Sequence, residues 1–243
     1  MSGHSKWAQI KHKKALTDAK RGQLFSKMVR EIMIAARSGG ALIETNSRLK
    51  TAIERAKASG LPKENIERAI ERASGSGDAA SLQEFIYEAM APGGVFIIVE
   101  GITDNKNRSL AEIKHTLSES GGKLAEQGSL LWNFEKIGLI NVSETDNADK
   151  TDGEIELQII ESGAEDLQKI NGGWIIETGF LELEKIRKEL ENKKIKIMDS
   201  YHDYKARAPV SVSPEEKNTV ETIIKKLSEH DDVQEVYTNL TND

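Results

Sequence analysis

Positively charged side chains surround one aromatic ring near the start of this 243-residue sequence. The run Lys6-Trp7-Ala8-Gln9-Ile10-Lys11-His12-Lys13-Lys14 holds four ammonium groups, an imidazole and an indole. Ammonium groups neutralise phosphates, and an indole can stack on a base or pack against a neighbouring helix. These residue types predict a nucleic-acid contact, with a solvated surface as the alternative. The residues that would make it are Lys6, Trp7, Lys11, His12, Lys13 and Lys14.

The next segment continues the positive charge along one side of a helix. The helical spacing of Leu24, Phe25, Met28, Val29, Ile32 and Ala36 predicts an amphipathic helix over residues 20–37, which Gly39-Gly40 ends. Lys20, Lys27, Arg30 and Arg37 fall on the opposite arc. The predicted phosphate-binding surface therefore extends from the terminal arm onto this helix.

The distribution of charge along the chain supports this location. The whole sequence has a net charge of −6. Residues 1–72 contain 16 Lys and Arg against 7 Asp and Glu, a net charge of +9, and the remainder has a net charge of −15. Of this excess, +7 lies in residues 1–37. A basic segment joined to an acidic body is typical of a protein that binds a polyanion through one part of its chain.

Two other segments invite comparison with nucleic-acid sites. Lys106 and Arg108 lie at the expected start of a helix, an end that repels cations, and a second anion contact there is an open alternative to ordinary hairpin geometry. A helix, a short turn and another helix at residues 46–73 resemble a DNA-reading pair. In the second of these helices, however, three glutamates cancel three cations. A neutral helix is a poor groove reader, so bundle packing is the interpretation that we adopt for this pair.

Several classes of protein are excluded or disfavoured by composition and spacing. The sequence has no cysteine and therefore no disulfide, zinc finger or thiol nucleophile. Its histidines show no metal-protease spacing, no nucleophile-elbow or phosphate-loop motif occurs, and His202-Asp203 is an isolated pair. We expect neither an enzyme nor a bound metal or cofactor. No apolar run suits a membrane span or signal peptide, which predicts a cytoplasmic protein without a membrane partner.

The periodicity of the chain predicts an α+β protein of three domains. Residues 1–78 form a basic helical domain, with a helix capped by Asn46 and another after the turn at Ser59-Gly60-Leu61-Pro62. Residues 135–204 follow the order βαββαβ, typical of a ferredoxin-like fold. This domain is inserted into a second ferredoxin-like domain, residues 79–134 plus 205–243. The second domain is expected to include strands at 85–90, 95–102, 130–134, 210–212 and 233–237 and helices at 107–118 and 214–227.

Several longer motifs in this order resemble the YebC/PmpR family. They are Gly3-His4-Ser5-Lys6-Trp7-Ala8, Asp18-Ala19-Lys20-Arg21-Gly22, Tyr87-Glu88 with Pro92-Gly93-Gly94, Asp104-Asn105-Lys106-Asn107-Arg108, Gly163-Ala164-Glu165-Asp166 and Asp231-Asp232-Val233-Gln234-Glu235-Val236-Tyr237. The resemblance extends from end to end. It implies a helical domain followed by two α/β domains, one interrupting the other. It also implies binding residues at the matching basic positions Lys6, Lys11, Lys13, Lys14, Lys20, Arg21, Lys27 and Arg30.

The function implied by the resemblance leaves more than one polyanion open. Bacterial members are customarily assigned as cytosolic DNA-binding transcriptional regulators, whereas mitochondrial relatives activate translation and some bacterial members are linked to ribosomes stalled on proline-rich stretches. We therefore expect a DNA-binding regulator, with a ribosome-associated translation factor as the alternative and a small-molecule sensor as a second alternative. The absence of dimer-like heptads weakens the operator-reading model, and the oligomeric state is open, with a monomer favoured.

Overall fold

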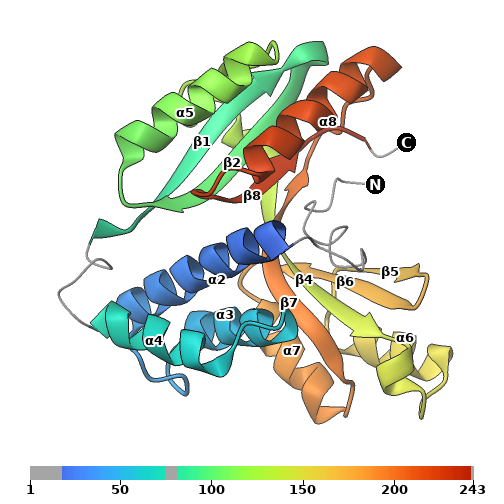
Figure 1. The fold of residues 1–243 in the computed structure, drawn as a ribbon. Coiled ribbons are helices and arrows are strands. Elements are labelled where there is room, and N and C mark those ends of the chain that lie inside the picture. The colour runs from blue at the N-terminus through green and yellow to red at the C-terminus, as the bar shows by residue number, and fades with distance from the viewer. Residues whose placement is uncertain (1–17, 75–80, 242–243) are drawn as a thin grey trace. The chain divides into compact units, whose positions relative to one another are not determined.

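The helical domain consists of three helices, α2 (Asp18–Gly39), α3 (Ser47–Ala58) and α4 (Lys63–Ser74), in a computed structural model that describes residues 18–74 and 81–241 (Figure 1). Met28, Ile32 and Ala36 on the predicted apolar arc of α2 are buried. Asn46 caps α3 as predicted, since its side chain accepts the Leu49 backbone N–H at 3.0 Å. Its amide also donates to the Ala35 carbonyl at 2.8 Å, which ties α3 to the end of α2.

The first α/β domain begins with a hairpin of β1 (Gln83–Ala91) and β2 (Val95–Thr103). Its connection, the 3-10 turn η2 (Pro92–Gly94), places Gly93 and Gly94 at φ angles of 74° and 72°, which glycine adopts readily. The sheet also contains β3 (Lys123–Leu124) and β8 (Val233–Thr238), in the order β3-β1-β2-β8. Helices α5 (Lys106–Glu119) and α8 (Pro214–Ser228) pack side by side on one face of this sheet (Figure 1).

Two predicted strands of this domain take other conformations. Residues 130–134 contain the 3-10 turn η3 (Leu131–Asn133), and residues 210–212 contribute one parallel bridge, from Val210 to Leu240. The domain therefore runs strand, strand, helix, strand, helix, strand, rather than βαββαβ. Its four-stranded antiparallel sheet with two helices on one face still agrees with the predicted fold class.

The second α/β domain has the βαββαβ order that its periodicity predicts. It contains β4 (Phe134–Ser143), α6 (Asp152–Glu161), β5 (Asp166–Ile170), β6 (Gly173–Gly179), α7 (Leu183–Asn192) and β7 (Ile197–Ala206). The strands are arranged β5-β6-β4-β7, and the core is formed by residues such as Ile140, Ile159, Trp174 and Leu190. The mixed class, helices followed by two α/β domains, is confirmed.

The chain forms two compact units. One comprises residues 1–134 and 206–243, and the other comprises residues 135–205. Within the first unit, Leu82 and Ile102 belong to the same apolar core as α2, α3 and α4, so the helical domain packs against the first sheet. In the parts of the chain that the structure describes, no helix is both long and apolar enough to cross a bilayer.

Candidate nucleic-acid interface

The predicted interface is divided between two parts of the chain. Six of its residues, Lys6, Trp7, Lys11, His12, Lys13 and Lys14, lie outside the described residues. The other four, Lys20, Arg21, Lys27 and Arg30, all lie on α2. Their surroundings decide which of them could reach a phosphate.

Lys20 and Arg21 are exposed in the first two turns of α2. The Nζ of Lys20 lies 3.5 Å from Oε1 of Glu229, and the two side chains are 56% and 48% exposed. An ion pair this exposed contributes about 0–1 kcal/mol, so it would be exchanged readily for a phosphate. Both residues remain accessible at the predicted surface.

Lys27 is buried, which sequence periodicity did not predict. Its side chain is 8% exposed, and Nζ donates to the Ser228 carbonyl at 2.7 Å. Burial lowers the pKa of Lys27 to about 8, although the carboxylates of Glu235 and Asp231 oppose this shift. The Lys27 ammonium group is therefore enclosed within the first compact unit and reaches a phosphate only if this contact opens, and its role in phosphate binding stays a prediction.

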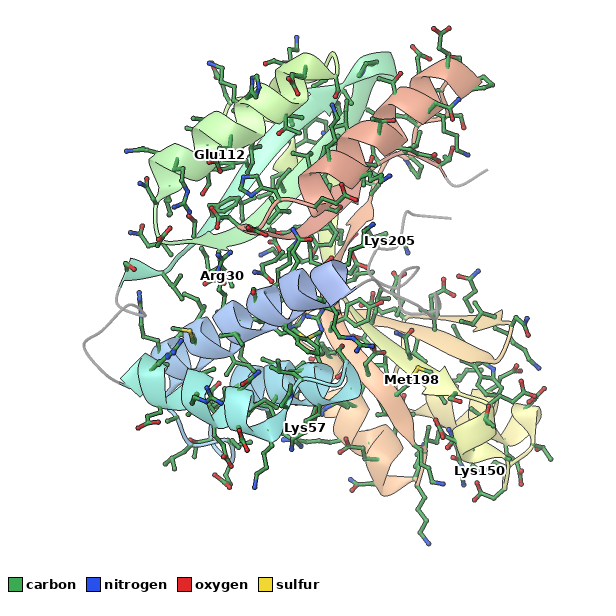
Figure 2. All side chains as sticks on the ribbon, in the orientation of Figure 1. Arg30, Lys57, Glu112, Lys150, Met198 and Lys205 are labelled. Carbon is green, nitrogen blue, oxygen red and sulfur yellow. The ribbon has the colours of Figure 1, made fainter. Side chains whose placement is uncertain are left out.

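Arg30, like Lys27, contacts the segment between α8 and β8. It lies on α2 (Figure 2), and its Nη1 donates to the Asp231 carbonyl at 2.6 Å and to Oδ1 of Asp232 at 3.0 Å. Gln23, one turn away from Lys27, donates to the Glu229 carbonyl and, at 3.0 Å, to Oδ1 of Asp231. The guanidinium of Arg30 thus already holds a carboxylate that a phosphate would have to replace, and the role of Arg30 in phosphate binding stays a prediction.

Asp232 is the centre of a buried polar network. Its Oδ2 accepts from Ser109 Oγ at 2.6 Å, Arg108 Nη2 at 2.9 Å and Thr103 Oγ1 at 3.1 Å, while Oδ1 accepts from Arg30. Burial acts to raise the pKa of Asp232, but these hydrogen bonds and the charge of Arg30 outweigh it and hold that pKa below its usual value. Asp232 is thus an ionised anchor between α2, β2 and α5.

This network also explains the cations that begin α5. Asn105 caps the helix by accepting the Arg108 backbone N–H at 3.1 Å. The Arg108 guanidinium pairs with Asp104 at 2.8 Å and Asp232 at 2.9 Å, and these contacts raise its pKa. Two carboxylates offset the repulsion from the helix N-terminus and already engage the Arg108 guanidinium, and the second anion contact stays a prediction. Lys106 is exposed, and its carbonyl accepts from the Tyr87 hydroxyl at 3.1 Å.

Among the described residues, one group could in principle hold a metal ion. Glu112, His230 and Asp232 place ligand atoms within 4.8 Å of one another. His230 Nε2 contacts Glu112 at 2.9 Å and Nδ1 accepts the Asp232 backbone N–H at 3.1 Å. Because both imidazole nitrogens and both Asp232 oxygens are engaged, a cation would have to displace several hydrogen bonds and face two guanidinium groups. We interpret the group as part of the polar network.

The isolated His202-Asp203 pair does not form a base and its orienting acid. Adjacent residues of β7 project to opposite faces of the sheet. The His202 ring packs on Phe180, with centroids 4.2 Å apart, whereas Oδ1 of Asp203 accepts the Tyr204 backbone N–H at 2.6 Å. The two side chains therefore have separate structural roles.

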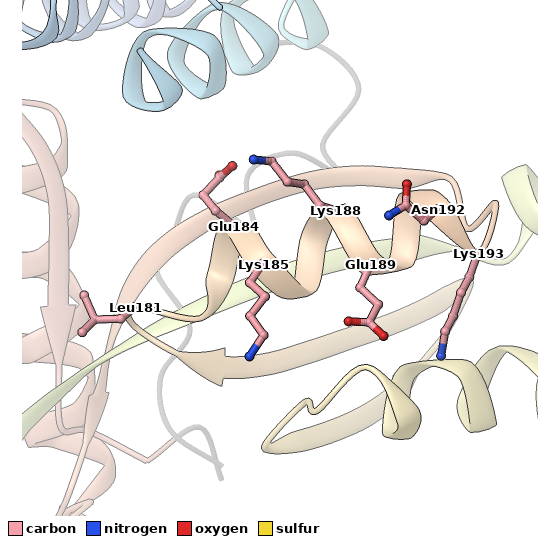
Figure 3. A pocket seen from close by; sticks show the side chains of 7 residues that line it. All are labelled: Leu181, Glu184, Lys185, Lys188, Glu189, Asn192 and Lys193. Carbon is pink, nitrogen blue, oxygen red and sulfur yellow. The ribbon is translucent and has the colours of Figure 1, made fainter. Parts of the chain in front are cut away.

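A depression along α7 offers little for a ligand to bind (Figure 3). It is open to solvent, and its lining alternates acidic and basic side chains on one helix, among them Glu184, Lys185, Lys188 and Glu189. Binding sites for small molecules are usually concave and apolar with a few converging polar groups. This depression does not support the small-molecule sensor alternative.

Sequence reasoning missed the partners of α2. Glu229 and Asp231 contact Lys20 and Gln23, and the pair Asp231-Asp232 would ordinarily be taken for a turn between a helix and a strand. The available signal was charge: residues 229–235 contain four carboxylates and no Lys or Arg. Such a run is a natural partner for a basic helix face in the same chain.

Comparison with known proteins agrees with this architecture. A family model described as the TACO1/YebC protein N-terminal domain matches residues 5–76, and one described as the TACO1/YebC second and third domain matches residues 82–240. A probable transcriptional regulatory protein of Caldanaerobacter subterraneus subsp. tengcongensis is 45% identical over 240 residues, covering 99% of this chain and 98% of the relative. A protein of Thermotoga maritima with the same description is 42% identical, covering 100% of this chain and 95% of the relative.

A solved structure is similar over nearly the whole length. The crystal structure of a conserved hypothetical protein from Aquifex aeolicus has a TM-score of 0.86 and 41% sequence identity, and the match covers 98% of this chain and 97% of that one. The family models, the full-length relatives and the solved structure all point to the same assignment. The chain belongs to the TACO1/YebC family.

Proposed function

We propose that this protein is a non-enzymatic regulator of gene expression that binds DNA through its basic N-terminal segment. The observation that carries the proposal is the position of the positive charge. Residues 1–17 contain four lysines and no acidic residue, and Lys20 and Arg21 extend this charge onto exposed turns of α2. The relatives named as probable transcriptional regulatory proteins support a regulatory role.

The proposed contact is sequence-tolerant and made mainly to phosphates. Lys6, Lys11, Lys13, Lys14, Lys20 and Arg21 are the proposed phosphate-binding residues, and Trp7 either stacks on a base or packs on the bundle. About five neutralised phosphates would give a logarithmic salt dependence near −4.5 on duplex DNA and a gentler one on single strands. The acidic remainder of the chain limits further attachment to the same polyanion.

One structural observation favours a second candidate, a translation factor that binds ribosomal RNA. On α4, Lys63 pairs with Glu67 at 3.4 Å and Arg68 pairs with Glu64 at 3.5 Å. A helix whose cations are matched by its own carboxylates is poorly suited to reading the major groove. The same basic segment would serve equally well on an RNA backbone.

Crosslinking separates these two candidates. The full-length protein is crosslinked to nucleic acid in cells and recovered, and both the DNA and the RNA bound to it are sequenced. Enriched genomic sites with little ribosomal RNA are expected for the transcriptional regulator. Enrichment of ribosomal RNA at discrete positions, with co-sedimentation on ribosomes at physiological salt, would overturn the DNA proposal in favour of the translation factor.

A further inference from the structure

The polar face of α2 is covered by an acidic segment from the other end of the chain. We define the acidic segment as residues 228–235, which link α8 to β8. Its contacts with α2 follow the helix for more than two turns: Glu229 with Lys20, Asp231 with Gln23, the Ser228 carbonyl with Lys27, and Asp232 with Arg30. All four partners on α2 donate, and all the partners on the acidic segment accept.

These acceptors have the chemistry of a phosphate backbone. The acidic segment carries four carboxylates, Glu229, Asp231, Asp232 and Glu235, spaced along an extended turn and strand. Arg55 of α3 continues the pattern, since its Nη2 lies 3.3 Å from Glu235. Guanidinium and ammonium groups bind carboxylate and phosphate oxygens by the same charge-assisted hydrogen bonds. A nucleic acid reaching α2 would meet cations that already hold an anion.

The contact between α2 and the acidic segment is more exposed at Lys20 and Glu229 than at Arg30 and Asp232. Lys20 and Glu229 are about half exposed, so solvent screens their attraction. Lys27 is buried and donates to the Ser228 carbonyl, and its lowered pKa indicates that the nearby carboxylates do not fully offset its loss of hydration. The first half of the α2 face is therefore held loosely, whereas Leu82 and Ile102 keep apolar contact with the helical bundle.

If α2 and the acidic segment separated, the buried carboxylate of Asp232 would keep most of its hydrogen bonds. Asp232 retains its hydrogen bonds from Thr103, Arg108 and Ser109, all within its own α/β domain. On α2, Lys20, Lys27 and Arg30 would then face solvent or a new anion. The exchange replaces one set of charge-assisted hydrogen bonds by another, and the apolar contacts at Leu82 and Ile102 can serve as the pivot.

Resting on the function proposed above, we infer that the acidic segment is an autoinhibitory counterpart of nucleic acid that occupies the phosphate-binding face of α2. Nucleic acid binds first to the lysines of residues 1–17 and then displaces the acidic segment from Lys20, Gln23, Lys27 and Arg30. With the acidic segment on α2 the protein binds nucleic acid through fewer cations than with the segment displaced. The affinity for nucleic acid therefore depends on how readily the acidic segment leaves α2.

Removing charge from the loosely held end tests the inference. In the full-length protein, the double variant Glu229→Gln/Asp231→Asn weakens the contact but leaves the buried Asp232 network intact. We expect duplex DNA to bind about tenfold more tightly, with a salt dependence steeper by roughly 0.9 for each cation released. The matched control Glu126→Gln/Glu221→Gln removes two exposed carboxylates elsewhere in the same unit. Equal gains in the two double variants would overturn the inference, because they would reflect net charge alone.

A covalent link tests the inference in the opposite direction. Because the sequence has no cysteine, Gln23→Cys and Asp231→Cys introduce the only two thiols, and a short bis-maleimide can join them. The linked protein is expected to bind the duplex about tenfold more weakly than the same variant with each thiol capped separately, with a shallower salt dependence. Equal affinities would show that nucleic acid does not need the contact to open.

The variant Lys11→Ala/Lys13→Ala/Lys14→Ala distinguishes this failure from failure of the proposed function. If this variant loses binding while the link has no effect, only the autoinhibitory contact is wrong. If the unmodified protein binds neither DNA nor RNA, the proposed function is wrong and the inference falls with it.

Discussion

Arg30 of α2 and Asp232 before β8 form an ion pair of 3.0 Å between residues that are 202 positions apart in the chain. The pair joins the helical domain to the first α/β domain. Asp232 is 3% exposed and Arg30 is 27% exposed, so the carboxylate depends on its protein partners far more than the guanidinium does. This asymmetry makes Asp232 the more informative position to change.

Replacement of Asp232 by alanine is expected to destabilise the first compact unit. The buried hydroxyls of Thr103 and Ser109 lose their shared acceptor, and Arg30 and Arg108 lose a common counter-ion. We expect the free energy of unfolding to fall by about 3 kcal/mol. Urea denaturation followed by circular dichroism measures this change. The neighbouring Asp231→Ala variant, which removes an exposed carboxylate, is expected to lose at most about 1 kcal/mol, and equal losses would contradict the central role of Asp232.

Stability should rise with pH where Lys27 releases its proton. Burial holds the pKa of Lys27 at about 8, below its ordinary value of 10.5. Between these pH values the unfolded chain binds more protons than the folded one, so stability increases as the pH rises through this window, and below about pH 8 the folded state carries the full cost of burying the charge. The expected gain is on the order of 3 kcal/mol at most.

The variant Lys27→Met isolates this contribution from other groups that titrate in the same range. The difference in unfolding free energy between the unmodified protein and Lys27→Met is measured at pH 7.5 and pH 10. We expect the free energy of unfolding of the unmodified protein to increase relative to that of Lys27→Met as the pH rises. Lys20→Met, which removes an exposed ammonium from the same helix face, serves as the control. A difference that stays constant for Lys27→Met would show that its ammonium is not desolvated.

Glu88 is expected to hold the loop that follows β3. Its buried carboxylate accepts backbone N–H groups from Gly128, from Leu130 at 2.5 Å and from Leu131 at 2.9 Å. Glu88→Gln would place an amide NH2 against these donors, and we expect a loss of about 2 kcal/mol with faster hydrogen exchange at Leu130 and Leu131. Glu84→Gln, four residues earlier on the same face of β1 and about half exposed, should change stability by less than about 1 kcal/mol. Similar losses in both would exclude this role for Glu88.

Much of the fold follows from local patterns in the sequence. The period of Met28, Ile32 and Ala36 predicts α2, and Ser213 followed by Pro214 predicts the start of α8, where a capping box with Glu216 forms. The strand expected at 130–134 failed for a tertiary reason. Leu130 and Leu131 direct their N–H groups to Glu88, more than 40 residues earlier, and a short apolar stretch carries no sign of that partner.

The candidate site shows the same division between local and long-range information. Composition predicts a basic surface at the N-terminal segment, and Lys20 and Arg21 at its described end are exposed. Composition did not reveal that Lys27 and Arg30 contact the acidic segment, because both sides of that contact look like ordinary solvated charges when they are considered alone. Spacing within α2 cannot specify a partner 200 residues away.

The salt dependence of nucleic-acid affinity tests directly whether the protein binds through its basic N-terminal segment. Binding of the full-length protein to a fluorescent DNA duplex is measured between 50 and 200 mM salt, alongside the variant Lys11→Ala/Lys13→Ala/Lys14→Ala. A control variant, Lys150→Ala/Lys185→Ala/Lys188→Ala, removes the same charge from the inserted domain. We expect a slope of about −4.5 for the unmodified protein and the control, and a slope shallower by about 2.7 for the N-terminal variant. A flat dependence, or equal slopes for all three proteins, would contradict binding through the basic N-terminal segment.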